Sequence, residues 1–154
     1  MIQIKLINNN LDYYNDLLYI LQVTDKDFIP SISSKIKLED VAKKYIDLAY
    51  CFIAYVDNKP AGFVAFYFNQ FPQDSYLSLI GVCEEFRGLE IGKNLELECI
   101  KYCKENNSKG LNLNMRKSNT RLYESRLKLG YKVVKEYYLP YSDELIIDMH
   151  LSFL

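Results

Sequence analysis

The stretch RGLEIGKNL, residues 87–95, has the residue types of an anion-binding site. It follows an apolar, strand-like run and precedes a segment with helical periodicity. The first turn of a helix has unpaired backbone N–H groups and the positive end of the helix dipole, so it attracts negative charge. Gly88 and Gly92 would allow close approach, and Arg87 and Lys93 would add positive charge. We predict a pyrophosphate-binding turn; an ordinary strand-to-helix turn is the alternative.

A glutamate, Glu90, stands in the middle of this stretch. If its position requires a positive φ, a non-glycine residue costs roughly 1 kcal/mol or more of strain. If Glu90 instead lies in the first helical turn with its side chain in solvent, the cost is small and the dipole favours its charge. We predict the second arrangement.

The cysteines and the histidine do not have the spacing of a metal site. Cys51 and Cys83 stand alone in apolar runs, and Cys99 and Cys103 are one helical turn apart without a CxxC pair. We expect buried or half-buried free thiols, because free cysteine packs as a small hydrophobe. His150, the single histidine, lies in a strand-like run, where we expect a local hydrogen bond and assign it no role.

Composition sets the outer limits. The 154 residues lack a linker-like segment, so we expect a single domain, residues 1–154, as a monomer or homodimer. The formal net charge is −1 and the 19 basic residues are dispersed, which argues against a nucleic-acid partner. No apolar run approaches the roughly 20 residues of a membrane helix, and the N-terminus lacks the pattern of a signal peptide. We expect no membrane partner and a cytoplasmic location.

These residues must be positioned by alternating strands and helices. Period-two patterns predict strands over Ile2–Ile7, Cys51–Val56, Ala61–Phe68, Tyr76–Val82, Leu111–Met115, Tyr131–Leu139 and Leu145–Leu151. Helical periodicity predicts helices over Leu11–Val23, Leu38–Ala49, capped from the side of Ser33 and Ser34, and Lys93–Asn106, and a fourth between Asn119 and Gly130. A turn at residues 57–60 makes a hairpin. The order predicts a mixed α/β layer in which an antiparallel meander leads into a parallel crossover.

The run VCEEFRGLEIGKNL resembles the acyl-CoA-binding motif of the GNAT acetyltransferase superfamily, written Q/R-x-x-G-x-G/A. Arg87 matches its first position and Gly92 its last, while Glu90 replaces the middle glycine. The segment NTRLYESRLKLGY is similar to a second signature of the family, in which an Asn opens a helix that ends in a Gly-Phe or Gly-Tyr pair. Asn119 and Gly130 fall in that register. With the preceding hairpin, the resemblance extends from about residue 51 to the end.

The resemblance implies a single-domain α/β fold with a mixed, mostly antiparallel sheet of about seven strands and about four helices. It implies that the sheet splits between Tyr76–Val82 and Leu111–Met115, and that acetyl-CoA, the cosubstrate, lies in the split. The pantetheine arm would pair with the backbone of Ile80 and Val82. The remaining cofactor-binding residues implied are Arg87, Gly88, Leu89, Glu90, Ile91, Gly92, Lys93, Asn119 and Arg126.

The chemistry implied is direct attack of an amine on the acetyl thioester, which needs a neutral amine, a stabilised oxyanion and a stabilised thiolate. By family likeness, a backbone N–H near Val82 is our candidate oxyanion donor. Five residues could act as the general base that deprotonates the amine: Tyr76, Ser78, Asp74, Glu84 and Glu85. For the two glutamates, the alternative is that they form a solvated strand end.

The sequence departs from the family where a tyrosine commonly protonates the thiolate. Arg126 stands at that position, and arginine cannot donate a proton at neutral pH, although its charge could stabilise a thiolate. Tyr123 lies three residues earlier on the same predicted helix face and could replace the phenol. The alternative is that Arg126 is a surface or CoA-phosphate contact and Tyr123 belongs to the core.

The acceptor is the least determined part. In this family, the segments that correspond to FIPSISSKIKLED and YYLPYSDEL would shape the acceptor site. The second segment has tyrosines and carboxylates that could receive a cationic amine. The alternative is that these residues are aromatic packing at a strand end: Tyr137, Tyr138, Tyr141, Asp143 and Glu144. The near-neutral charge favours a small-molecule primary amine. The alternatives are a protein N-terminus or lysine, and a catalytically idle acyl-CoA-binding domain.

Overall fold

The computed structural model describes residues 1–70, 73–140 and 142–154. The chain forms two compact units, each described here by itself. Unit 1 comprises Met1–Tyr67 and Ser78–Tyr102, and unit 2 comprises Phe68–Leu77 and Cys103–Leu154. The expectation of one domain therefore stays a prediction.

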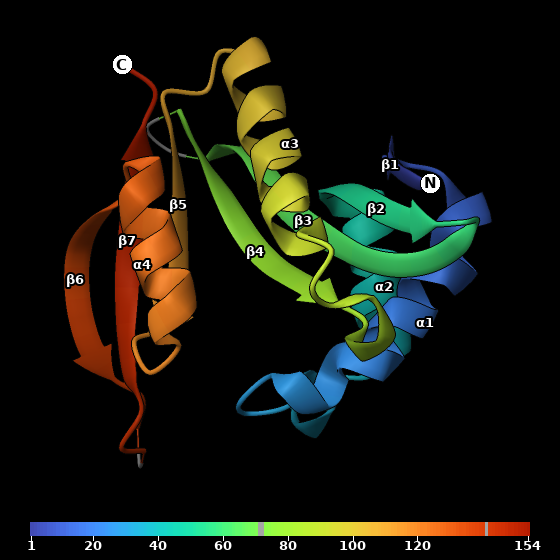
Figure 1. Ribbon diagram of the computed structural model, residues 1–154, viewed down its shortest axis with the longest axis horizontal. Coiled ribbons are helices and arrows are strands. Elements are labelled where there is room, and N and C mark those ends of the chain that lie inside the picture. Colours follow the sequence, from blue (N-terminus) through green and yellow to red (C-terminus); the bar gives the residue numbers. More distant parts are fainter. Residues whose placement is uncertain (71–72, 141) are drawn as a thin grey trace. The chain divides into compact units, whose positions relative to one another are not determined.

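Unit 1 is built from three strands, the end of a fourth, two helices that follow the first strand, and most of a long third helix (Figure 1). Its elements are β1 (Ile2–Leu6), α1 (Tyr14–Thr24), α2 (Leu38–Leu48), β2 (Tyr50–Val56), β3 (Lys59–Gln70), the end of β4 (Asp74–Val82) and most of α3 (Ile91–Glu105). Short 3₁₀ turns lie at Leu11–Tyr13, Asp25–Asp27, Ile32–Ser34 and Glu84–Phe86. The strand and helix types match the sequence predictions, with ends shifted by a few residues.

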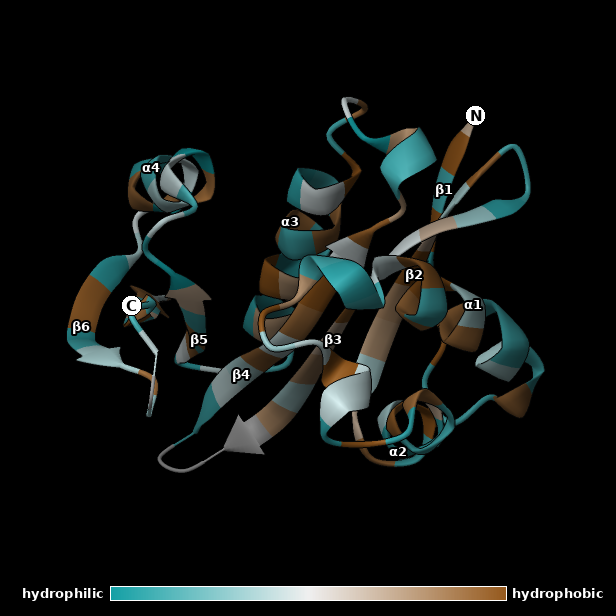
Figure 2. Cartoon of the chain, turned by 90° about the horizontal axis from the view of Figure 1, so that it is seen from below, coloured by the Kyte–Doolittle hydropathy of each residue, from teal (hydrophilic) through white to brown (hydrophobic). Residues whose placement is uncertain are grey.

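Antiparallel pairing joins β1 to β2 and β2 to β3. Val56 pairs with Lys59, so the β2–β3 hairpin turns on Asp57 and Asn58, whose φ values of 48° and 69° suit a two-residue turn of type I′. The predicted hairpin is confirmed. Apolar side chains dominate β2 and β3 (Figure 2), and those facing α1 and α2 form the core of this unit.

The cap predicted for α2 is wrong. Lys37 precedes the helix and supplies no side-chain cap. The Ser33 hydroxyl instead binds the Asp25 carboxylate, and the Ser34 hydroxyl donates to the Ser31 carbonyl at 2.6 Å. The intervening 3₁₀ turn engages both serines before the helix begins, so neither reaches its free N–H groups.

Unit 2 contains the start of β4, the end of α3, and β5 (Gly110–Arg116), α4 (Thr120–Leu129), β6 (Lys132–Tyr138) and β7 (Leu145–Ser152). The start of β4 runs parallel to β5, with Ser75 opposite Leu111. Antiparallel pairing joins β5 to β7 and β7 to β6. The buried pairs Leu111–Leu151, Leu113–Met149 and Met115–Ile147 give β5 and β7 one apolar face.

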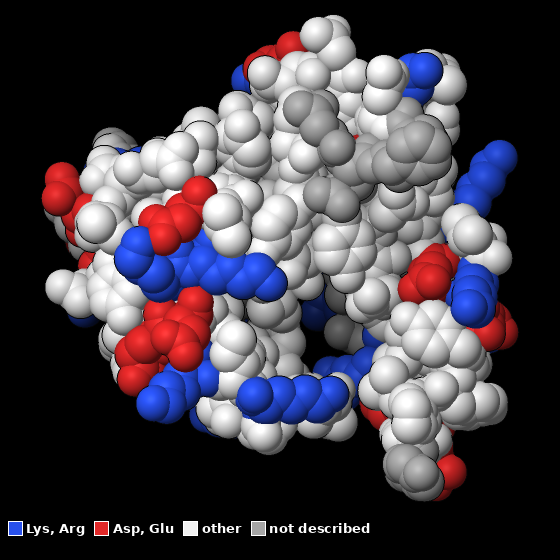
Figure 3. Space-filling model, turned by 180° about the vertical axis from the view of Figure 1, so that it is seen from behind, with Lys and Arg blue, Asp and Glu red and all other residues white. Residues whose placement is uncertain are grey.

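The described residues form a seven-stranded sheet in the order β1-β2-β3-β4-β5-β7-β6, which confirms the predicted mixed α/β fold with one parallel pair. The four cysteines are buried free thiols, as predicted. Basic and acidic side chains are interspersed on the surface shown in Figure 3. Among the described helices, none has the length and apolar character needed to cross a membrane.

Candidate active site

The predicted pyrophosphate turn lies in unit 1, between the 3₁₀ turn Glu84–Phe86 and α3. Residues 87–90 are exposed, and Gly88 has a φ of 87°. The Glu90 carbonyl accepts the Asn94 N–H at 3.0 Å, so the helical bonding begins at Glu90. The N–H groups of Ile91, Gly92 and Lys93 therefore belong to the first turn of a 15-residue helix, where the dipole favours an anion.

The two glycines of the turn have different roles. Gly88 is needed for its positive φ, since a Cβ there would meet nothing within 4 Å. Gly92 has no such φ, and its added Cβ would only touch Val82 Cγ2 at 3.5 Å. Neither the backbone nor the packing of the described chain requires a glycine at position 92. The absence of a side chain at Gly92 leaves the N–H groups at the start of α3 accessible.

The arrangement predicted for Glu90 is wrong. Its φ is 60°, in the left-handed region, and the helix begins only at Ile91. Glu90 is the last of the four residues between the 3₁₀ turn and α3, outside the helix rather than in its first turn. The side chain is exposed, as expected.

The basic side chains of the turn differ in availability. Arg87 Nη2 lies 2.6 Å from Asp27 Oδ2, so an anion would compete with an existing ion pair. Lys93 is exposed and has no ion-pair partner among the described residues. Of the two basic side chains of this turn, Lys93 is therefore available to an anion, while Arg87 is engaged by the Asp27 carboxylate.

The end of β4 presents the backbone groups that were assigned to the pantetheine arm. The Cys83 N–H donates to the Ala61 carbonyl of β3 at 2.8 Å. Successive N–H groups of an extended chain point to opposite edges of the strand. The N–H groups of Val82 and Ile80, one and three residues before Cys83, therefore point to the edge opposite that of the Cys83 N–H. The Val82 N–H therefore points to the strand edge away from β3, the orientation that its predicted role requires.

Helix α4 in unit 2 has the limits predicted from the second signature. The Asn119 side chain accepts the Leu122 N–H at 3.3 Å and caps the N-terminus. Gly130 ends the helix with a φ of 110°, and its N–H bonds to the carbonyls of Arg126 and Leu127. Asn119 thus has a structural role as the N-cap of α4, and its assignment to the cofactor site stays a prediction.

Tyr123, the candidate acid, and Arg126, the candidate for stabilising the thiolate charge, lie three residues apart on α4. Arg126 is 3% exposed, so the alternative that made it a surface residue is wrong. Tyr123 is half-buried, so it is neither fully in the core nor fully in solvent. Their catalytic roles stay predictions.

Tyr76 is better suited to donate a proton or hydrogen bond than to act as a base. Burial raises the pKa of its phenol, and the nearby charge of Asp148 raises it further against the lowering effect of Asn114. Its hydroxyl accepts the Asn114 amide at 3.2 Å. The phenol is therefore neutral near pH 7.

Three of the other four base candidates already have partners, while Glu85 is exposed. Ser78 shares a hydrogen bond with the Tyr45 hydroxyl at 2.8 Å, within unit 1. Glu84 pairs with Lys26 at 3.2 Å and is exposed. Asp74 accepts the Asn112 amide at 3.1 Å. Each would need a water or a change of partner to take a proton.

The tyrosine and carboxylate cluster predicted for the acceptor is divided by the structure. Tyr141 lies outside the described residues. Glu144 contacts Arg116 at 3.5 Å and Ser118 at 3.3 Å, and Tyr138 is 64% exposed. The Tyr137 hydroxyl donates to Asp148 at 3.2 Å.

Sequence reasoning missed Asp148, which stands on a different strand from Tyr137. Only the cross-strand register of β6 and β7 brings the two together. The alternation in LIIDMHL places Asp148 on the same side of its strand as His150, and this pattern is the sequence feature that could have pointed to Asp148.

Comparison with known proteins identifies the family. The model of the Acetyltransferase (GNAT) family matches residues 17–131, and the chain belongs to this family of acyltransferases. No protein of curated function matches the chain.

Solved structures share the fold. One is a "putative streptothricin acetyltransferase" from Bacillus anthracis in complex with acetyl coenzyme A, with 26% identity and a TM-score of 0.63 over 72% of this chain and 67% of that one. The ribosomal-protein-S18-alanine N-acetyltransferase from Escherichia coli has 18% identity and a TM-score of 0.79 over 99% and 94% of the two chains. A Bacillus subtilis acetyltransferase in complex with CoA has 18% identity and a TM-score of 0.71 over the full length of both.

Proposed function

We propose that this protein transfers an acetyl group from acetyl-CoA to a primary amine of a small molecule. The observation that carries the proposal is the exposed turn before α3, where a helix start left open at Gly92 lies beside the cation of Lys93. Family membership and the acetyl-CoA complex of the Bacillus anthracis neighbour support the same cosubstrate.

In the proposed reaction, the neutral amine attacks the thioester carbonyl, the new C–N bond forms and the C–S bond breaks. The Val82 N–H stabilises the oxyanion. The ammonium formed on attack loses a proton to a base or water, and the CoA thiolate takes a proton from Tyr123 while Arg126 stabilises the negative charge. Tyr123 then regains a proton from solvent, which balances the proton released by the ammonium. Tyr76 contributes as a hydrogen-bond donor. We place this activity in the cytoplasm, in a monomer or homodimer.

A thiol-release assay with acetyl-CoA and a panel of amines tests the proposal. Release that depends on a small amine supports it. Release only with a peptide bearing an N-terminal alanine would favour a protein acceptor, the activity named for the Escherichia coli neighbour. Calorimetric binding of acetyl-CoA without release for any acceptor would favour an idle acyl-CoA-binding domain.

The same assay tests helix α4. Tyr123→Phe should slow acetyl transfer on the order of 100-fold, because it removes the proposed proton donor. Arg126→Lys keeps the charge and should slow transfer less than Arg126→Met, which removes it. Thermal unfolding of each variant checks the fold, since Arg126 is buried. Unchanged turnover in all three would remove this helix from the chemistry.

A further inference from the structure

The sheet of unit 2 has a polar face opposite its apolar one. Along β5, Leu111, Leu113 and Met115 are buried, while the alternating asparagines are half-buried or exposed. We call the opposite side the polar face and define it by eight side chains from β4, β5, β6 and β7: Asp74, Tyr76, Asn112, Asn114, Lys135, Tyr137, Asp148 and His150.

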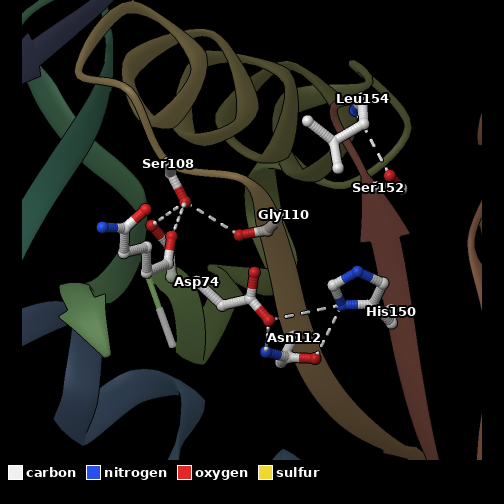
Figure 4. A network of polar contacts seen from close by, with 9 residues as sticks. Asp74, Ser108, Gly110, Asn112, His150, Ser152 and Leu154 are labelled. Carbon is white, nitrogen blue, oxygen red and sulfur yellow. Dashed lines mark hydrogen bonds and ion pairs between the residues drawn. The ribbon is translucent and has the colours of Figure 1, made fainter. Parts of the chain in front are cut away.

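One end of the polar face is satisfied internally (Figure 4). The Asn112 amide donates to Asp74 at 3.1 Å, and Asn112 Oδ1 lies 2.9 Å from His150 Nδ1. His150 Nδ1 is also 3.9 Å from the Asp74 carboxylate. These three side chains use one another as partners, so this end ties β4, β5 and β7 together.

The other end has unused capacity for hydrogen bonds. Asp148 is half-buried, and in the described part of the chain only its Oδ1 accepts a hydrogen bond, from the Tyr137 hydroxyl at 3.2 Å. The Tyr76 hydroxyl accepts from Asn114 at 3.2 Å, which leaves its own hydrogen to donate. Burial, followed by the charge of Asp148, raises the pKa of both phenols, so both stay neutral beside one carboxylate.

This end already attracts an ammonium group. Lys135 stands opposite Asp148 in the β6–β7 register, and its Nζ lies 5.4 Å from the centre of the Tyr137 ring. Arg116 and Glu144 pair with each other at 3.5 Å at the margin of the face. Asp148 and the Tyr137 ring therefore already accommodate one ammonium group, that of Lys135, and a cation from a ligand could compete with it for the same carboxylate and ring.

We propose that Tyr76, Tyr137 and Asp148 bind a second, protonated amine of the acceptor, which makes the acceptor a diamine or a larger polyamine or amino sugar. One amine cannot serve both purposes, because the amine that attacks the thioester must be neutral and the amine held by Asp148 must be charged. The inference rests on the proposed function and adds the substrate class.

Matched acceptors test this proposal. With wild-type protein, 1,4-diaminobutane should have a KM at least about tenfold below that of 1-aminobutane, since only the diamine makes a charge-assisted contact. Asp148→Asn keeps the shape and the acceptor for Tyr137, and it should raise the KM of the diamine by about tenfold with little change in kcat. Lys135→Met should lower that KM by removing the competing ammonium.

Glu136→Gln is the matched control. It removes one negative charge from the same strand, where Glu136 is exposed and paired with Lys117 at 3.1 Å, so both KM values should stay unchanged. Equal KM values for the two amines in wild type, or a diamine preference that survives Asp148→Asn, would overturn the proposal.

Calorimetry separates this proposal from the proposed function. Titration of 1,4-diaminobutane into wild type and Asp148→Asn, without acetyl-CoA, should give binding that the substitution weakens about tenfold. If neither amine is ever acetylated, the proposed function fails, and the calorimetric difference still decides the cation site. Diamine binding that is absent from wild type, or equal in the two proteins, refutes the site.

Discussion

At Glu90 the backbone conformation matters more than the charge. Its φ of 60° places a residue with a Cβ in the left-handed region, while its side chain extends into solvent. The N–H groups that follow it stay in the first turn of α3. The substitution of the motif glycine therefore strains the turn without removing its donors.

Glu90→Gly should raise the free energy of unfolding by about 1 kcal/mol, because relief of left-handed strain exceeds the added entropy of the unfolded chain. The affinity for acetyl-CoA should rise by less than tenfold, since the amides are already in place. Urea unfolding and calorimetric titration measure the two quantities.

Leu89→Gly is the control for the change in stability, because Leu89 has no positive φ and a glycine there should lower the free energy of unfolding. A tenfold or larger gain in affinity for Glu90→Gly would show that the carboxylate itself obstructs the cofactor.

At the scale of an element, α4 shows how the motif residues define a helix. Asn119 caps its start and Gly130 ends it, and the buried Arg126 lies in its last turn. Residues that the resemblance assigns to the cofactor thus also set where the helix begins. A change at Asn119 must therefore be separated into its effects on stability and on binding.

Asn119→Ala should lower the free energy of unfolding by about 1 kcal/mol through the loss of the N-cap. Urea denaturation measures this, and acetyl-CoA titration at a temperature where both proteins are folded measures binding. Asn119→Ser keeps a capping oxygen and should be near wild type in stability. If Ser restores stability but not affinity, the Asn119 side chain also contacts the cofactor.

For the whole molecule, we expect the burial of thiols and phenols to control stability in alkali. Desolvation is the main cause that raises the pKa of five groups above their ordinary values of 9.0 for cysteine and 10.0 for tyrosine: Cys51, Cys83, Tyr55, Tyr76 and Tyr137. Each is neutral in the folded chain at a pH where the unfolded chain has begun to ionise. Their contribution is complete below pH 9 and is lost as the pH rises through the folded pKa values.

The free energy of unfolding should therefore be flat from neutral pH to about pH 8 and fall steadily above pH 9. Urea titrations at a series of pH values measure the slope. Tyr55→Phe removes one titrating group, together with its hydrogen bond to Asp16 at 2.6 Å. It should lower stability at neutral pH and flatten the alkaline decline. A decline as steep as that of wild type would show that Tyr55 is not one of the groups responsible.

Periodicity and turn chemistry were enough to predict the order and type of the elements. The hairpin at Asp57 and Asn58 and the limits of α4 follow from local rules, because each depends on residues close together in the sequence. The spacing of the two glycine-containing segments likewise indicated the family that the comparison identified.

Local rules failed where a residue's state depends on segments distant in the sequence. The left-handed φ of Glu90 has no signal in its own residue type, and the burial of Arg126 cannot be read from a helix rich in polar residues. The pairing of Tyr137 with Asp148 arises from a cross-strand register with a shift between Val133 and Lys135.

The sequence by itself thus determined the type and order of the elements and the position of the turn that we propose binds an anion, since these arise from neighbouring residues. The tertiary structure alone decided which side chains share a face, which cations are already paired and which phenols stay neutral. Those properties depend on packing and strand register. They are the basis for the proposal that the acceptor carries a second, protonated amine.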